Sequence, residues 1–294
     1  MFLPIKPCSP AELEFLIKNF SPKKSPGYDN ITGRILQELP RKALVFISRL
    51  FNAILRLQYF PKLWKAANII MIPKPGKPAN EVTSYRPISL LPILSKVFER
   101  MLLKRIMPML EDQKTIPDHQ FGFRGKHATV EQIHRVANAI STALEEKKYV
   151  SAAFLDVSQA FDKVWHTGLK FKIKTCIPQF YVLLKSYLED RKGRIKFQDQ
   201  YSNWFELEAG VPQGSVCGPI LYNIYTADLP VSENTISATF ADDTAVIATD
   251  KNKERASDIL QRVLDSIQGW DKRWRSKLNS EKSTHVTFTL RSGN

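Results

Sequence analysis

Apolar residues recur every three to four positions in three stretches near the start of the chain, which is the spacing of an amphipathic helix. This pattern predicts helices over residues 11–20, 41–57 and 94–106. The loop SPKKSPGYDN, rich in Pro, Gly and Lys, ends the first of them. Between the second and third helices, AANIIMIPKPGKP is typical of a short apolar strand that enters a basic turn, so we expect a strand and turn within 68–90.

A second set of elements begins near residue 129. Thr129 and Gln132 have the spacing of a capping box, and they open a helix whose apolar residues recur with a helical period. The remaining elements follow in the order β–α–β–β–α–β, the ferredoxin-like split motif. We therefore expect an α+β protein with an antiparallel sheet and helices on one of its faces. The expected elements are a strand at 150–157, a helix at 218–229, two strands within 236–249, a helix at 254–274 and a strand at 285–290, with a hairpin inserted in RKGRIKFQDQYSNWFELEAG.

Composition excludes several kinds of protein. Of the 294 residues 43% are hydrophobic and 24% are charged, so the chain is not wholly disordered. No apolar run approaches the roughly 20 residues that span a bilayer, and the start MFLPIKPCSP lacks the apolar segment of a secretory signal. We therefore expect an intracellular protein with no membrane partner. The three cysteines are odd in number and far apart, which favours reduced thiols over disulfides or a zinc site.

The charge is strongly positive and unevenly placed. The formal net charge is +14; residues 1–126 hold 21 basic and 9 acidic side chains, against 22 and 20 in residues 127–294. This balance favours a polyanionic partner such as nucleic acid, although a basic surface kept for solubility would show the same excess. The asymmetry predicts a module that grips phosphates, followed by one with another task.

Three carboxylates mark the candidate chemistry. Asp242 and Asp243 interrupt the apolar sequence FADDTAVIA, and Asp156 ends the strand SAAFLDV. Asp is common in turns, so the adjacent pair alone has a purely structural interpretation. In the β–α–β–β–α–β order, however, the first strand neighbours the central hairpin, which would bring the three carboxylates together. Such a cluster needs a cation, and oxygen ligands suit Mg²⁺ in phosphoryl transfer.

Seven segments, in order, resemble the motifs of reverse transcriptases. AAFLDVSQAFDKVWH, AGVPQGSVCGPILYNIYTADLP and FADD resemble motifs A, B and C, and SPGYDNI, IPKPGKP, SYRPISLLPILSKVFERML and QFGFR complete the set. Together they resemble the polymerase of a jockey-like, non-LTR (LINE-type) retrotransposon. This resemblance implies a right-hand polymerase fold, with mainly helical, basic fingers in residues 1–128 and a palm in residues 129–294, some finger elements being interleaved.

The resemblance also implies a reaction. An RNA-directed DNA polymerase of this family extends a primer 3′-hydroxyl with dNTPs on an RNA template, by phosphoryl transfer with two Mg²⁺ ions, for which Mn²⁺ is a possible substitute. The expected partners are the RNA template, a DNA primer or RNA–DNA hybrid, and dNTPs. Asp156 and Asp242 match the metal-binding aspartates and Asp243 the third catalytic carboxylate, while Val157 would lend a backbone carbonyl to the metal site.

Motif positions imply further roles in nucleotide binding. Phe161 matches the aromatic steric gate that excludes ribonucleotides; the alternative is a core ring packed on Trp165. Pro212, Gln213 and Gly214 precede the motif B helix, where Gly permits a close approach of backbone and ligand and the Gln amide can contact the nascent base pair. Taken alone, PQGS also fits a plain helix-initiating turn.

Cations have the weakest individual signals. By resemblance, Lys74 and Arg86 contact the triphosphate of the incoming dNTP, and Lys282 matches the motif D lysine that protonates the leaving pyrophosphate. Solvated surface cations are the alternative for all three. His127 and His166 lack a second ligand at zinc spacing, so we expect no zinc site.

Residues 163–197 form a candidate nucleic-acid track. They hold nine basic and two acidic residues, and aromatic side chains that can stack on unpaired bases. The surface of an amphipathic helix is an equal competitor. The aromatic residues are Phe171, Tyr181, Tyr187 and Phe197.

The chain also departs from the family pattern. Cys217 stands where these elements usually carry an aliphatic residue. Family members carry an endonuclease before the polymerase and a thumb after it, so we expect a missing or truncated thumb here, with both regions elsewhere in a full-length element. A non-catalytic RNA-binding relic or fragment is therefore the alternative function. An RNA-dependent RNA polymerase is a third, which Phe161 disfavours. A cytoplasmic ribonucleoprotein and the nucleus are both expected locations.

Overall fold

The computed structural model describes residues 5–291, and the chain divides into two compact units. Unit 1 contains the residues up to 115 and residues 166–221, and unit 2 contains residues 116–165 and those from 222 onward. Each unit is built from two separate stretches; in unit 1 they are joined by the pairing of β4 with β1. The chain passes from one unit to the other three times, and the division into fingers and palm near residue 128, with some finger elements interleaved, stays a prediction.

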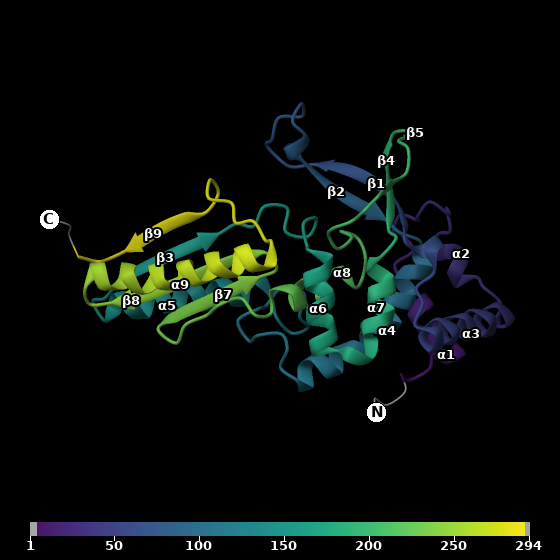
Figure 1. The fold of residues 1–294 in the computed structure, drawn as a ribbon, viewed down its shortest axis with the longest axis horizontal. Helices are drawn as coiled ribbons and strands as arrows, with labels where there is room; N and C mark the ends of the chain where they lie inside the picture. The colour runs from purple at the N-terminus through teal and green to yellow at the C-terminus, as the bar shows by residue number, and fades with distance from the viewer. Residues whose placement is uncertain (1–4, 292–294) are drawn as a thin grey trace. The chain divides into compact units, whose positions relative to one another are not determined.

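Unit 1 combines helices with a mixed sheet (Figure 1). Its strands lie in the order β2-β1-β4-β5, with β6 also paired to β4; β1 and β2 are antiparallel, whereas β1 and β4 are parallel. In chain order the elements are α1 (Pro10–Lys18), α2 (Gly33–Gln37), α3 (Arg41–Leu57), the short 3₁₀ helix η1 (Lys62–Trp64), β1 (Ala66–Pro73), η2 (Val82–Ser84), β2 (Tyr85–Leu90), α4 (Ile93–Asp112), α6 (His166–Cys176), η3 (Pro178–Phe180), α7 (Tyr181–Leu188), β4 (Lys192–Phe197), β5 (Gln200–Tyr201) and β6 (Phe205–Glu206).

Aromatic rings form the centre of unit 1. Phe51 of α3, Phe98 of α4 and Tyr187 of α7 are fully buried, and edge-to-face contacts link them through Phe60 and Trp64. Such pairs add to the gain from burying large apolar rings. The helical period predicted over residues 41–57 is confirmed to the residue by α3 and supplies one side of this core.

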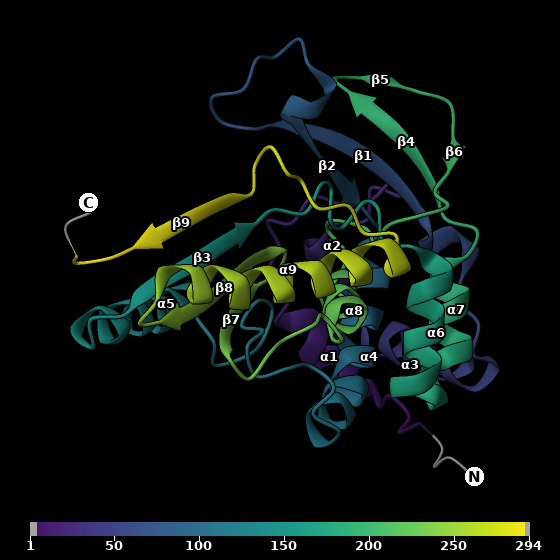
Figure 2. The ribbon, with the colours of Figure 1, turned by 60° about the vertical axis from the view of Figure 1, so that its left-hand side comes forward.

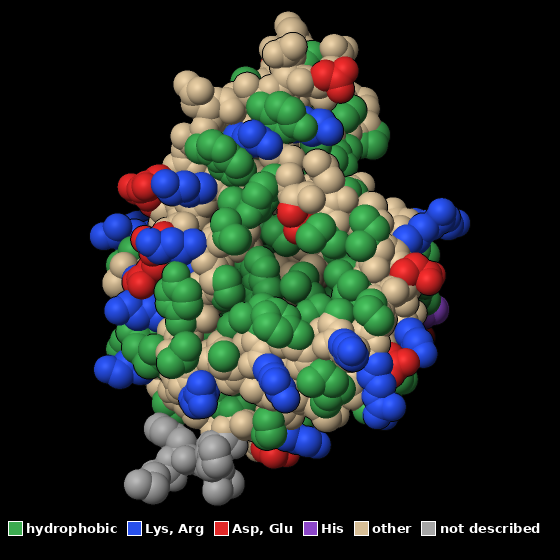
Figure 3. Space-filling model, turned by 90° about the vertical axis from the view of Figure 1, so that its right-hand side faces the viewer, with side chains coloured by type: hydrophobic (Ala, Val, Ile, Leu, Met, Phe, Trp, Pro, Cys, Tyr) green, Lys and Arg blue, Asp and Glu red, His purple; other side chains and the backbone are tan. Residues whose placement is uncertain are grey.

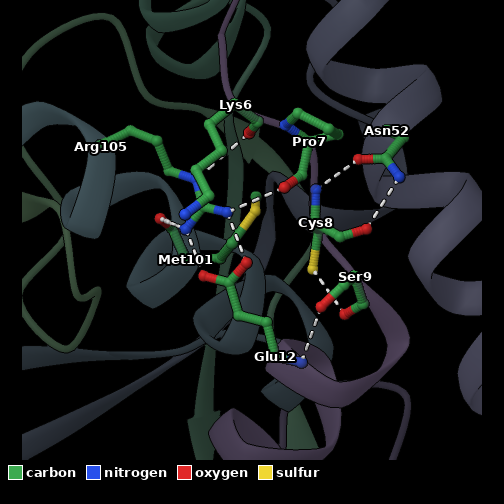
Figure 4. A network of polar contacts seen from close by, with 8 residues as sticks. All are labelled: Lys6, Pro7, Cys8, Ser9, Glu12, Asn52, Met101 and Arg105. Atoms are coloured by element: carbon green, nitrogen blue, oxygen red, sulfur yellow. Dashed lines mark hydrogen bonds and ion pairs between the residues drawn. The ribbon is translucent and has the colours of Figure 1, made fainter.

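A polar network fastens the start of the described chain to α3 and α4 (Figure 4). The amide of Asn52 exchanges hydrogen bonds of 2.7 and 2.9 Å with the backbone of Cys8. The guanidinium of Arg105 donates to the carbonyls of residues 6 and 7 and to both carboxylate oxygens of Glu12. Burial raises the pKa of the Cys8 thiol to about 11, so it stays neutral. All three cysteines are free thiols, as expected.

Apolar side chains also reach the surface of unit 1. Figure 3 shows them gathered over the face that carries α1 to α3, with Lys and Arg around them. Phe15, Phe46 and Leu57 are among the exposed apolar residues of these helices. Within residues 5–291, no helix has the length and apolar character needed to cross a bilayer.

Unit 2 has the predicted split motif. Its antiparallel sheet has the order β7-β8-β3-β9, so the two strands of the central hairpin and the last strand flank the first one as the motif requires. Helix α8 begins in unit 1 and ends in unit 2. The elements are α5 (Thr129–Glu145), β3 (Tyr149–Leu155), α8 (Gly218–Thr226), β7 (Thr235–Phe240), β8 (Asp243–Asp250), α9 (Lys253–Trp274) and β9 (Thr284–Phe288).

Helices cover both faces of this sheet, so the expectation of helices on one face is wrong in that detail. Helix α9 lies along the sheet (Figure 1) and packs on Ala153, Val246 and Ala248. Helix α5 packs on Ala152 and Ile247, which alternate with them and therefore point to the other side. The second layer forms because both faces of β3 and β8 are apolar.

The start of α5 also differs from the prediction. Its N-cap is Ala128, whose N–H donates to the Glu131 carboxylate at 2.7 Å, one residue before the expected capping box. Gln132 is instead buried, and its amide donates to the carbonyls of His119 and Thr239. The Gln132 side chain therefore links α5 to β7 and does not cap the helix.

Candidate active site

The acidic hairpin of unit 2 is a tight two-residue turn. Phe240 pairs with Asp243 across the β7–β8 ladder, which leaves Ala241 and Asp242 as the turn. Ala241 takes a φ of 59°, a left-handed value that L-residues adopt at a cost. One carboxylate therefore lies at the tip of the hairpin and the next begins β8.

A second segment holds this turn in place. The side chain of Gln120 accepts from Ala241 N–H at 3.0 Å and donates to the Ala241 carbonyl at 3.2 Å. A Cβ on Gly122 would lie 2.1 Å from the Ala241 nitrogen, so only Gly permits this approach. The Gln and the Gly of QFGFR thus both contact the acidic turn.

Strand register relates Asp156 to the hairpin. Leu155, the last residue of β3, pairs with Thr244 of β8, so the next step along both chains sets Asp156 opposite Asp243. The backbone of Asp156 is fixed on its other edge, where its carbonyl accepts from Asn279 N–H at 2.8 Å. The register thus places two of the three predicted carboxylates on neighbouring strands, and the third in the adjoining turn.

The edge beside Asp156 offers a further oxygen and a cation. The bridge between Val157 and Leu278 uses the carbonyl of Asp156, so the alternation of an extended chain turns the carbonyl of Val157 toward the hairpin side. The Lys282 ammonium lies 3.8 Å from Oδ2 of Asp156. Within residues 5–291 no group of three or more His, Cys, Asp or Glu side chains is arranged to hold a metal ion. Binding there would require Lys282 to move away from the carboxylate.

Phe161 is held between two rings. It stacks on Tyr222 with ring centroids 4.5 Å apart and meets the edge of Phe123 at 5.8 Å. Trp165, its expected partner in the core interpretation, lies instead against the guanidinium of Arg275. Burial, helped by the charge of Asp242, raises the pKa of Tyr222, which stays neutral. The half-buried Phe161 ring therefore packs between two aromatic side chains.

In unit 1 the expected nucleotide-binding residues lie on β1, β2 and the loop before α8. Arg86 is exposed on β2, opposite Ile72. Lys74 directly follows β1, and its ammonium donates to the carbonyl of Thr83 at 2.8 Å. The Gln213 carbonyl accepts from Ser89 N–H at 2.7 Å, which joins the motif B loop to the strand that carries Arg86.

Gly214 and Pro212 shape this loop. Gly214 has a φ of 113°, and a Cβ there would lie 2.6 Å from the Ser89 carbonyl oxygen. Ser215 donates its hydroxyl to the carbonyl of Pro212 at 2.9 Å and accepts from Gly218 N–H, which caps the start of α8. The loop is therefore both a helix-initiating turn and a close contact with β2.

Sequence reasoning missed a buried carboxylate that supports the same loop. Glu99 of α4 is fully buried, and its Oε2 accepts from the N–H groups of Val216 and Cys217 at 2.7 and 2.9 Å. Its other oxygen accepts from the Ser95 hydroxyl at 3.1 Å. Burial raises the pKa of Glu99, opposed by these hydrogen bonds and by the charge of Arg191. The only sequence signal was its place in SYRPISLLPILSKVFERML.

The candidate track of residues 163–197 is wrong in part. Tyr187 of α7 and Arg191 are buried against each other, and Lys172 of α6 is buried as well. Phe171 and Phe197 remain exposed. His166 is also structural: its Nε2 lies 2.7 Å from the Gly210 carbonyl, and burial lowers its pKa.

Comparison with solved structures supports this architecture. A truncated apo telomerase from Candida tropicalis matches 90% of this chain and 57% of its own, with a TM-score of 0.56 at 17% identity. A second telomerase structure from the same organism, with a fragment of telomeric RNA, gives a TM-score of 0.55 at 16% identity and covers 85% of this chain and 46% of its own. The fold is an α+β polymerase fold with fingers and palm.

Sequence comparison supplies the family. Residues 72–291 match the reverse transcriptase (RNA-dependent DNA polymerase) family, and the chain belongs to it. It is 47% identical over 297 residues to the probable RNA-directed DNA polymerase from transposon X-element, and 44% identical over 302 residues to that from mobile element jockey, both of Drosophila melanogaster. These matches cover 99% and 100% of the chain, which spans about a third of either relative's length. The predicted resemblance is confirmed.

Proposed function

We propose that this chain is the polymerase part of a non-LTR retrotransposon reverse transcriptase, which extends a primer 3′-hydroxyl with deoxynucleotides on an RNA template. The observation that supports it best is the acidic hairpin, Asp242 and Asp243, in register beside the strand that ends at Asp156, within a chain of this family. Unit 2 is then the palm and unit 1 the fingers. The endonuclease and thumb of a full-length element would lie in the regions of its relatives that the chain does not span.

The chemistry of the oxygen donors at the hairpin suits two divalent ions, which these side chains would hold after rearranging from their positions in the structure. Asp156, Asp242 and Asp243 would hold them, with the Val157 carbonyl as a further oxygen ligand, and such hard oxygen ligands favour Mg²⁺, with Mn²⁺ as a substitute. When bound, the ions supply activation of the primer hydroxyl and charge neutralisation at the phosphates. The Lys282 ammonium, 3.8 Å from Oδ2 of Asp156 in the structure, would leave this contact when the ions bind and would then give a proton from its Nζ to the departing pyrophosphate.

The remaining residues would select and orient the nucleotide. The Phe161 ring, fixed by Tyr222, would fill the space that a ribose 2′-hydroxyl needs. Arg86 and Lys74 would bind the triphosphate by charge-assisted hydrogen bonds. Gln213, with Pro212 and Gly214 shaping its loop, would contact the nascent base pair. The Ser89–Gln213 hydrogen bond couples these last contacts to those of Arg86.

Primer extension on a poly(rA)/oligo(dT) duplex with Mg²⁺ tests this proposal. The wild-type chain and Asp242→Asn are compared with dTTP and UTP in separate reactions. Asp250→Asn is the matched control, because this Asp ends the same strand, β8, and an amide keeps its capping oxygen for Asn252 N–H.

We expect the wild type and Asp250→Asn to extend with dTTP, and Asp242→Asn to bind the duplex without extending it. Undiminished extension by Asp242→Asn would refute the assignment of the hairpin. Efficient use of UTP would favour an RNA polymerase. Salt-dependent RNA binding by a wild-type chain that incorporates no nucleotide would favour a non-catalytic RNA-binding module.

A further inference from the structure

Helix α3 of unit 1 carries two apolar stripes, and only one of them is buried. The first faces the core of the unit. The second lies on the solvent side, where Phe46 is 70% exposed, Leu50 37% and Leu57 67%. With Ala43 and Ala53, these residues recur at alternating intervals of three and four positions, which is the spacing of a coiled-coil seam. We call these five residues the exposed seam of α3.

A line of cations borders the exposed seam on one side. Lys42, Arg49 and Arg56 follow one another at intervals of seven residues, so they share one side of the helix. All three side chains are exposed, and no carboxylate within residues 5–291 forms an ion pair with any of them. The whole helix holds four basic residues and no acidic one. Figure 3 shows Lys and Arg around the apolar side chains of this face.

The other border of the seam belongs to the interior of unit 1. Ile47 and Ile54 occupy it, and both are buried. The exposed seam therefore has one basic border and one that is closed by the fold. Single exposed apolar residues are ordinary on a protein surface. Five in register along a helix about 25 Å long form a continuous apolar strip, which is the shape that a second helix covers.

The charges beside the seam select the partner. In paired helices the residues that flank the seam accept opposite charges and reject like ones, so a basic border favours a partner with carboxylates. Helix α3 of a second copy would not supply them. In an antiparallel pair its cations would meet Arg49 and Arg56, and in a parallel pair these would meet the buried Ile47 and Ile54 of the other copy.

Other occupants would use only part of the surface. A nucleic acid would use the cations, but of the seam residues only Phe46 has a ring on which a base can stack. A lipid surface favours an apolar face of about 100° or more, whereas a coiled-coil seam is narrower. An apolar, acidic helix would use both the seam and its basic border.

We propose that the exposed seam of α3, with its border of Lys42, Arg49 and Arg56, is a docking surface for an acidic amphipathic helix of a partner protein. The apolar residues of the partner would cover Phe46, Leu50 and the rest of the seam, and its Glu or Asp side chains would pair with the three cations. The surface is independent of the proposed polymerase function, so its test needs no enzymatic activity.

Two synthetic peptides of about four heptads serve as probes. Both have Leu at the seam positions; one has Glu at every flanking position, and the other has Lys there. Binding of each labelled peptide to the full chain is measured by fluorescence anisotropy. We expect the Glu peptide to bind about tenfold more tightly than the Lys peptide, because it forms ion pairs with three cations. This preference should shrink as salt is added.

Substitutions in the seam test its apolar part. Leu50→Gln and Leu57→Gln each remove an apolar side chain that the partner would cover, so each should weaken binding of the Glu peptide about tenfold. Val182→Gln is the matched control, because Val182 is an exposed apolar residue of another helix, α7. Its affinity for the Glu peptide should equal that of the wild type.

Charge reversal tests the basic border. The double variant Arg49→Glu/Arg56→Glu should bind the Lys peptide more tightly than the Glu peptide, which reverses the wild-type preference. The control is Arg262→Glu/Lys272→Glu, which changes the net charge equally at exposed positions of α9. This control should keep the preference for the Glu peptide.

Several results would overturn the proposal. These are equal affinity of the wild type for the two peptides, a loss in Val182→Gln as large as in the seam variants, or a preference that the α9 control reverses as well. Sedimentation velocity of the chain alone tests self-association: a dimer that dissociates in Leu57→Gln would assign the seam to a second copy. Single-stranded RNA, or phosphatidylcholine–phosphatidylserine vesicles, whose binding falls more than that of the Glu peptide in Leu57→Gln would likewise replace the helix as occupant.

Circular dichroism melting of each variant identifies any that fails to fold. For a seam variant that does, Leu50→Ala or Leu57→Ala takes its place. The same loss of Glu-peptide binding is expected, because truncation to Ala removes the same apolar contacts. Wild-type affinity in a folded Ala variant would overturn the proposal.

Discussion

Glu99 offers a sharp test of how the motif B loop is held. Its Oε2 accepts from two backbone N–H groups of the segment that leads into α8, at 2.7 and 2.9 Å, and the whole side chain is buried. The Gln213 loop is fixed on one side by Ser89 of β2 and on the other by this single oxygen. Replacing Glu99 by Ala removes the acceptor, whereas replacing it by Gln keeps an oxygen of the same reach.

The two substitutions should differ greatly in their cost. A buried donor left without an acceptor costs about 1–3 kcal/mol. Glu99→Ala leaves two backbone N–H groups without their acceptor, so it should lower the free energy of unfolding by about 2–5 kcal/mol. The cost is smaller for Val216 N–H, which is only partly buried, than for Cys217 N–H. In Glu99→Gln the amide oxygen takes both bonds, and the amide nitrogen faces the Ser95 hydroxyl, which can accept. Because no charge is then buried, this variant should be as stable as the wild type or more stable at neutral pH.

The pH dependence of stability tests the effect of the Glu99 charge separately. Burial raises the pKa of Glu99 in the folded chain above the unfolded value of about 4.3. The folded state therefore holds its proton over a range in which the unfolded state has lost it, and stability falls as the pH rises from about 4.3 to the folded pKa. The difference in unfolding free energy between Glu99→Gln and the wild type should thus grow over this range and then level off.

Urea unfolding of the wild type and both variants, at pH values from 4 upward, measures these effects. Ser95→Ala is the control, since it removes only the hydroxyl that donates to the other oxygen of Glu99. If Glu99→Gln is as unstable as Glu99→Ala at neutral pH, the fold requires the negative charge of Glu99 itself. Arg191 and Lys96 are the cations that interact with this charge. That result would refute the view of Glu99 as a hydrogen-bond acceptor first.

Three further substitutions test other parts of the structure. Gly122→Ala should abolish primer extension but not RNA binding by anisotropy, since its Cβ would lie 2.1 Å from the Ala241 nitrogen; an active variant would show that the turn needs no such contact. Phe161→Val should raise the use of UTP relative to dTTP by about tenfold in single-nucleotide incorporation, and an unchanged ratio would exclude a steric gate there. Trp270→Phe should lower the free energy of urea unfolding by about 1 kcal/mol, because it loses the 2.8 Å hydrogen bond from Nε1 to Asp228; no loss would mean that water replaces the bond.

Local sequence patterns predicted much of the fold. The apolar spacing over residues 41–57 sets α3, and the strand–turn–strand pattern around FADD sets β7, β8 and a two-residue turn, because periodicity and turn chemistry act between residues close in the chain. The order of elements was sufficient for the split motif and its sheet order. The acidic residues and the nucleotide-binding residues were found by motif resemblance, which needs no three-dimensional information.

Only the tertiary structure determines the contacts between residues that are distant in sequence. Gln120 accepts a hydrogen bond from Ala241, 121 residues away, and Glu99 accepts one from Val216, 117 residues away. The sequence around Gln120 and Glu99 does not distinguish either of them from an ordinary polar residue. Likewise, nothing in the spacing of Tyr187 and Arg191 marks them as buried, since Tyr187 packs on Phe60 of the aromatic core and Arg191 on Tyr187. A residue's own sequence neighbours determine its secondary structure and turn chemistry, whereas its hydrogen-bond partners and its exposure depend on which distant segments the whole chain brings beside it.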